Sequence, residues 1–261
     1  MPRAAPLSSV LALMTLLSGL LLARRADAYR PFDGTDADVA ELGTFELELG
    51  PTHYYRQGSQ NYLLVPATVL NFGVLEGTEI VIDAQDRLAI GKLGAGVPRF
   101  AFADDDVLVK HTFRDGILQG KTGVSIAAEG GLLTPEVNGT DSIGASIDVI
   151  TSYRWSFGTI HWNEWFELTR EHYANLYTGV ILEGPFDWRV RPVAELYYDK
   201  DWLEGSTESA LVGAIWTLKD SFMLDAAVRG ARVADQDALE VRLGFTWTLT
   251  MWEPKGKSAT D

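Results

Sequence analysis

The stretch from Leu239 to Leu249 alternates strictly between two kinds of residue. Its apolar members are Leu239, Val241, Leu243, Phe245, Trp247 and Leu249. The residues between them are Glu240, Arg242, Gly244, Thr246 and Thr248, which are polar or small. A period of two is typical of a β-strand with one apolar and one polar face. The apolar face must then be covered either by a protein core or by lipid.

The N-terminus has the features of a secretion signal. Arg3 precedes an apolar run, Val10–Ala23, and Ala26-Asp27-Ala28 matches an A-x-A cleavage site. We therefore expect residues 1–28 to be a signal peptide that is cleaved near Ala28. The apolar run is shorter than the roughly 20 residues that a membrane-spanning helix needs, although a retained anchor is the alternative.

Charge and cysteine content exclude several classes of function. The chain has a formal net charge of −14 and contains no cysteine. The acidic balance argues against a nucleic-acid partner and against binding to an anionic membrane surface. Without cysteine there is no disulfide framework and no thiol chemistry. An exported chain of this kind needs a large core or a bilayer to stabilise it.

Alternation continues along most of the chain and predicts an all-β fold: a transmembrane antiparallel β-barrel of about 12 strands. We divide the chain into a signal peptide (1–28), an N-terminal periplasmic segment (29–42), the barrel (43–252) and a polar C-terminal tail (253–261). The strands are expected at 43–56, 60–73, 76–91, 104–116, 120–133, 143–155, 157–169, 171–184, 187–200, 206–218, 221–233 and 238–250.

Two further regularities favour lipid over a protein core as the cover of the apolar face. Alternate connections are short, such as Val74-Leu75 and Lys219-Asp220, whereas the longest, Lys92–Ala103 and Thr134–Ser142, belong to the other set. Short turns at one end and longer loops at the other are typical of outer-membrane barrels. Aromatic residues are also expected in two bands at opposite strand ends, where bilayer interfaces select them. One band holds Tyr54, Tyr55, Tyr62, Tyr173, Tyr197, Tyr198 and Trp202; the other holds Phe72, Trp155, Phe157, Phe186, Trp188, Phe222 and Trp252.

If the apolar face meets lipid, the polar positions between its residues line the lumen. The candidate lumen-lining residues carry both signs of charge: Glu46, Glu79, Lys110, Arg114, Glu129, Arg191, Glu195, Arg229, Glu240 and Arg242. Twelve strands lie between barrels filled by side chains and barrels with a water-filled channel. The lumen is therefore either a narrow mixed-charge passage or a polar core closed by ion pairs.

The sequence lacks the motifs of common catalytic sites. None of the four histidines is followed two residues later by serine, the spacing used by barrel esterases. There is no G-x-S-x-G elbow, no His/Cys metal spacing and no phosphate or dinucleotide loop. We therefore expect no catalytic residues, no metal and no cofactor.

Several stretches are similar to outer-membrane proteins grouped as phenol-degradation meta-pathway transporters. They are the RPFDGTDADVAELGTFELELGP segment, Gly77-Thr78-Glu79, Asp106–Lys110 and Pro192–Tyr198. The resemblance implies a transmembrane β-barrel that transports small, often aromatic compounds. Its matching lumen positions are Glu79, Lys110 and Glu195, and it implies no catalytic residues.

These observations favour a bacterial outer-membrane barrel that acts as a passive pore or transporter. Its expected partners are outer-membrane lipid, lipopolysaccharide and a small hydrophilic or aromatic solute. One alternative is a structural or adhesive outer-membrane barrel whose long loops bind an external partner. Another is a soluble periplasmic β-barrel that binds a ligand.

Overall fold

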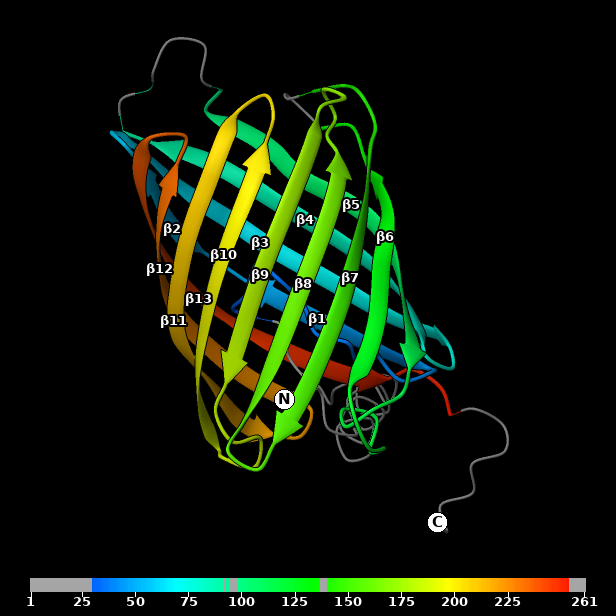
Figure 1. Cartoon of the computed structure of the whole chain (residues 1–261). Coiled ribbons are helices and arrows are strands. Elements are labelled where there is room, and N and C mark those ends of the chain that lie inside the picture. The colour runs from blue at the N-terminus through cyan, green and yellow to red at the C-terminus, as the bar shows by residue number, and fades with distance from the viewer. Residues whose placement is uncertain (1–29, 92, 94–97, 137–139, 254–261) are drawn as a thin grey trace, which may run out of the picture.

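A single antiparallel sheet closes on itself in the computed structural model, which describes residues 30–91, 93, 98–136 and 140–253 (Figure 1). The expected signal peptide and most of the expected C-terminal tail lie outside these residues. The strands are β1 (Thr44–Gly50), β2 (His53–Gln57), β3 (Gln60–Leu75), β4 (Thr78–Ile90), β5 (Phe100–Arg114), β6 (Ser125–Leu133), β7 (Gly144–Trp155), β8 (Gly158–Leu168), β9 (Ala174–Glu183), β10 (Val190–Asp201), β11 (Gly205–Lys219), β12 (Phe222–Val233) and β13 (Gln236–Thr250).

The first barrel strand is interrupted, so that β1 and β2 together occupy one place in the wall. Both segments pair with β3 on one side and with β13 on the other. Pro51 and Thr52 lie at the break, and a proline has no N–H to donate to a neighbouring strand. The wall is therefore a closed barrel of 12 strands, which confirms the predicted fold class.

The barrel closes between β1 and β13, and β13 contains the alternating stretch from Leu239 to Leu249. Leu47 lies opposite Trp247, and Glu48 lies opposite Thr246. Because the sheet closes, it has no exposed edge strand that could pair with another chain. Each of the twelve strands predicted from the sequence overlaps a barrel strand of the structure.

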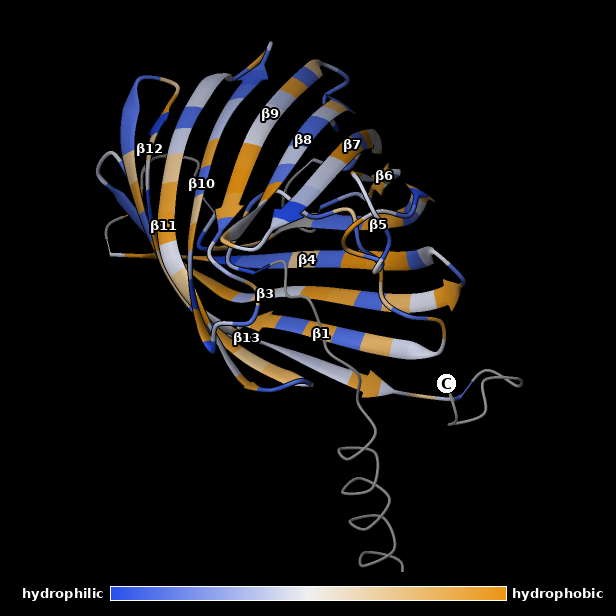
Figure 2. Ribbon diagram, turned by 60° about the horizontal axis from the view of Figure 1, so that its bottom comes forward, coloured by the Kyte–Doolittle hydropathy of each residue, from blue (hydrophilic) through white to orange (hydrophobic). Residues whose placement is uncertain are grey.

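The outer face of the wall is apolar and the inner face is largely polar. Leu196 and Val212 are 62% and 64% exposed, whereas Glu195 and Glu240 are almost completely buried. Figure 2 shows apolar and polar residues alternating along the strands. This inverts the arrangement of a water-soluble barrel, in which the apolar residues form the interior. The outer apolar surface is the arrangement that lipid requires.

The connections define two rims that differ less in loop length than expected. The terminal rim holds Gly43, whose carbonyl accepts a hydrogen bond from the Met251 N–H. The opposite rim, here the loop rim, holds the connections 91–99 and 134–143. The connection 115–124 at the terminal rim is as long as these two. It folds inward against the N-terminal segment. There the Gln119 side chain donates to the carbonyl of Ala37.

The predicted aromatic bands are present at the rims in part. Trp155, Trp188 and Trp252 are exposed near the terminal rim, and Tyr198 and Trp202 are exposed near the loop rim. Tyr55 and Tyr197 differ, because both contact the inward-facing Arg229 and so belong to the lumen. In the part of the chain that the structure describes, no helix is long and apolar enough to cross a membrane.

Candidate functional site: the lumen and its N-terminal strap

Residues 30–42, which we call the strap, lie inside the barrel. We expected them to form a periplasmic segment ahead of the wall, but their contacts are with inward-facing side chains. At one end of the strap Arg30 reaches Asp225 on β12, and at the other the Ala40 N–H reaches Glu79 on β4. Between them, Thr35 meets Asn163 on β8. The strap therefore crosses the lumen from one side of the wall to the other.

Backbone N–H groups of the strap are held by side chains of five different strands, β1, β4, β7, β8 and β10. Glu195 on β10 accepts hydrogen bonds from the N–H groups of Asp33 and Gly34, at 2.9 and 2.8 Å. Further acceptors on the wall are Asn163 Oδ1 for Thr35 at 2.7 Å, Ser152 Oγ for Ala37 at 3.0 Å and Glu79 Oε2 for Ala40 at 2.6 Å. A segment without secondary structure needs such partners, because an unpaired buried N–H is costly.

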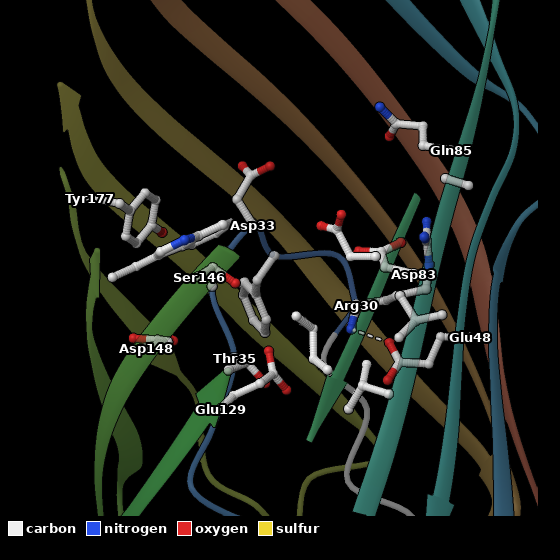
Figure 3. Close-up of a pocket in the computed structure, with 18 of the residues that line it drawn as sticks. Arg30, Asp33, Thr35, Glu48, Asp83, Gln85, Glu129, Ser146, Asp148 and Tyr177 are labelled. Atoms are coloured by element: carbon white, nitrogen blue, oxygen red, sulfur yellow. Dashed lines mark hydrogen bonds between the residues drawn. The ribbon is translucent and has the colours of Figure 1, made fainter. Parts of the chain in front are cut away.

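Charged side chains of the strap form ion pairs with the wall. Arg30 lies 3.3 Å from Asp225, and its backbone N–H donates to Glu48 at 3.1 Å (Figure 3). Asp33 accepts from Arg242 at 2.8 Å. Arg30, Asp225 and Arg242 are almost completely buried, where an unpaired charge would be strongly unfavourable.

Two small apolar clusters anchor the strap to the inner wall. Phe32 packs against Val193, Ile215 and Met223, which face inward from β10, β11 and β12. Ala37 is fully buried with Ala127 and Ile150 at the other side of the lumen. Apolar residues therefore also face inward where the strap covers them.

The wall also contains ion pairs of its own. Glu240 lies between two guanidinium groups, with Arg229 at 2.8 Å and Arg242 at 2.9 Å. In a second group, Arg191 lies 3.3 Å from Glu183, and His161 Nε2 is hydrogen-bonded to the same carboxylate at 2.9 Å. At the loop rim, a hydrogen bond from Thr140 lowers the pKa of Glu171. The inner wall is therefore lined by charges that are paired with one another.

A cavity of about 430 Å³, here the chamber, lies between the strap and the loop rim. Arg30, Asp33 and Thr35 of the strap contribute to its lining. Figure 3 shows these three residues together with Asp83, Glu129 and Asp148 of the wall around the same space. In size the chamber matches the pockets that hold small molecules.

The structure brings most of the sequence-predicted lumen residues together inside the barrel. Those buried at the inner wall are Glu46, Glu79, Lys110, Arg191, Glu195, Arg229, Glu240 and Arg242. Glu129 is half-buried and lines the chamber. Arg114 differs: it is exposed at the end of β5, because the β5–β6 register shifts between Thr112 and Arg114 and disturbs the alternation there.

Sequence reasoning identified Glu79 and Glu195 as lumen residues but missed two other residues that hold the strap. Asn163 and Ser152 are almost completely buried in the lumen, and each forms a hydrogen bond with the strap. A signal was present in β11, where Leu211 and Ile215 alternate with Val212 and Trp216, so that both faces are apolar. A lumen position with an apolar side chain needs something inside the barrel to cover it.

The similarities of this chain to known proteins lie among solved structures and are at low sequence identity. No protein-family model matches the chain, and no curated protein matches it significantly. Among solved structures, the chain is similar to the KdgM porin, with 12% identity and a TM-score of 0.48 over 78% of this chain and 98% of that one. The chain is also similar to the CymD monoaromatic hydrocarbon channel, with 8% identity and a TM-score of 0.45 over 82% of this chain and 90% of that one. Its similarity to the translocator domain of the autotransporter NalP from Neisseria meningitidis has 11% identity and a TM-score of 0.42, over 92% of this chain and 97% of that one.

The described side chains that line the chamber are mainly charged, polar and aromatic. No group of three or more His, Cys, Asp or Glu side chains among the described residues is placed to hold a metal ion. The inner wall instead combines fixed charges, hydroxyl groups and aromatic rings around a solute-sized chamber. This arrangement can bind and release a small polar molecule.

Proposed function

We propose that this chain is a bacterial outer-membrane channel for small solutes and that its strap narrows the passage. The observation that carries the proposal is the inverted barrel: an apolar outer face around a polar lumen with a solute-sized chamber. Closed barrels with this polarity span outer membranes. Lipid and lipopolysaccharide are then the partners of the outer face.

The barrel is oriented with its terminal rim at the periplasm. Barrels with an even number of strands have both ends of the wall on one side, which in outer-membrane proteins is the periplasmic side. The strap then fills the periplasmic half of the lumen, and the chamber lies toward the loop rim, outside. Solutes enter the chamber first and pass the strap second.

The conductance of the refolded chain tests this function. Residues 30–261 in planar bilayers should give small single-channel currents, and a variant lacking residues 30–40 should give larger ones because the lumen is wider. Variant Arg232→Met, at an exposed position, is the control and should conduct like the unchanged chain. Absence of current and of liposome uptake from both the unchanged and the shortened chain would refute the channel.

The sequence resemblance to phenol-degradation transporters adds a finer proposal about the solute. Small aromatic compounds would fit a chamber lined by Trp165, Tyr177 and Tyr197. Liposome swelling with phenol against glycerol tests it, and equal rates would remove the preference for aromatic solutes. A loop-mediated adhesive function has no specific observation in its favour.

A further inference from the structure

Five consecutive strands of the chamber wall, β4 to β8, each direct a carboxylate into the chamber. We call this set the carboxylate band: Asp83, Asp106, Glu129, Asp148 and Glu167. Carboxylates fixed around a low-dielectric cavity focus a negative potential inside it. Rings of Asp and Glu are the usual means by which pores favour cations.

Two pairs within the band are direct cross-strand neighbours of the same charge. Asp83 lies opposite Asp106 on β4 and β5, and Glu129 lies opposite Asp148 on β6 and β7. Like charges at directly opposite positions of antiparallel strands destabilise a sheet. A bound cation would relieve this repulsion.

The cations of this part of the lumen are each shared among several carboxylates. Lys110 faces Glu129 in the β5–β6 register, but its ammonium lies 3.7 Å from both Asp36 and Glu79. Arg170 lies 3.0 Å from Asp106 and 3.9 Å from Glu136. Arg30 and Arg242 also line the chamber, but they pair with Asp225 and with Asp33 and Glu240. Carboxylates therefore outnumber cations, and the band keeps a formal net negative charge.

Asp148 gives an independent indication of a ligand. It is 8% exposed, lines the chamber, and its Oδ1 has no hydrogen-bond partner among the described residues. The indole Nε1 of Trp165, directly opposite Asp148 on β8, also lacks a partner there. Buried polar atoms are nearly always paired, so an unpaired acceptor at a cavity wall suits a donor from a solute.

Aromatic rings continue the wall beside Asp148. The ring centroids of Trp165 and Tyr177 are 5.4 Å apart, and those of Tyr177 and Tyr197 are 4.9 Å apart. All three residues line the chamber. Aromatic faces next to a carboxylate bind organic ammonium groups by cation–π attraction and apolar contact.

We propose that the chamber binds small organic ammonium ions, with the ammonium group against Glu129 and Asp148 and the apolar body on Trp165. A metal ion fits less well, because the described carboxylates spread along the wall and do not converge as ligands. The inference deepens the proposed function, since it names the class of solute that the channel would take from outside.

Calorimetry on the folded chain in detergent micelles tests the site without relying on conductance. Phenethylammonium should bind at least tenfold more tightly than phenethyl alcohol, and phenylacetate should not bind. The isosteric variant Glu129→Gln/Asp148→Asn should lose tenfold or more in phenethylammonium affinity. The control, Asp187→Asn/Glu208→Gln, removes the same charge from exposed positions and should bind normally.

A second variant separates the carboxylate and aromatic contributions. Trp165→Leu should weaken phenethylammonium binding severalfold while leaving methylammonium binding unchanged; equal loss for both would overturn the aromatic contact. Equal binding of amine, alcohol and carboxylate, full binding by the Glu129/Asp148 variant, or preferential binding of Ca²⁺ would each overturn the site. Heat-modifiable migration in SDS gels checks that every variant folds. Amine binding by a protein that gives no current would refute the channel and leave the site standing.

Discussion

Single carboxylates and guanidinium groups decide how tightly the strap is held. Arg242 shows the principle, because its guanidinium donates to Asp33 and to the carbonyl of Pro31 in the strap, and to Glu240 in the wall. Its positive charge is therefore balanced by one carboxylate of the strap and one of the wall. Removing one member of such a buried group leaves the others with less compensation, which can cost more than the pair contributes.

The substitution Arg242→Met tests this balance. Methionine keeps much of the length of the side chain but leaves Asp33 and Glu240 with less positive charge, so we expect a loss of about 3–5 kcal/mol in the free energy of unfolding. Urea titration of the barrel in lipid vesicles measures it. The exposed Arg232, which pairs with Asp237, provides the control, because Arg232→Met should change stability by less than about 1 kcal/mol. Similar losses for both variants would contradict the buried network.

Among the elements, the strands could be predicted from the sequence and the strap could not. Strand prediction succeeds because one covered face imposes a period of two over ten or more residues. The strap carries no period, since its partners are spread over β1 to β13, up to 211 residues away. The prediction that Arg114 lines the lumen was wrong for a local reason. The register shifts at the end of β5, and the alternation of the sequence does not reveal such a shift.

The position of the strap can be tested by an engineered disulfide, because the chain has no cysteine of its own. The Ala37 N–H lies 3.0 Å from Ser152 Oγ, so the pair Ala37→Cys/Ser152→Cys should cross-link on mild oxidation. The linked channel should conduct no more than the unchanged chain, and reduction should leave that current equal or raise it. The control pair Ala37→Cys/Val149→Cys should stay reduced, because Val149 faces outward. Equal cross-linking of both pairs would contradict a strap fixed in the lumen.

At the scale of the whole molecule, the outer face distinguishes a membrane barrel from a soluble one. Leu243 lies at the middle of β13 and is 55% exposed. In a bilayer, Leu243→Arg should cost about 2–4 kcal/mol in the free energy of unfolding, since the charge meets the hydrocarbon midplane. In a water-soluble barrel, the same substitution should alter the free energy of unfolding by no more than about 0.5 kcal/mol.

Urea unfolding in lipid vesicles, combined with fractionation of cells, measures this difference. The control Leu203→Arg, in the connection between β10 and β11, should be nearly neutral because that residue lies at the rim. A neutral result for Leu243→Arg, with extraction of the protein without detergent, would favour the soluble periplasmic barrel.

The order in which the chain is made has a consequence for how the strap reaches its place. Residues 30–42 leave the ribosome before any strand. Arg242, which donates hydrogen bonds to Pro31 and Asp33, belongs to the last strand. The strap's docking site is therefore complete only after the wall has closed between β1 and β13. Capture of the strap can then serve as the final step of assembly, one that an incompletely closed barrel cannot perform.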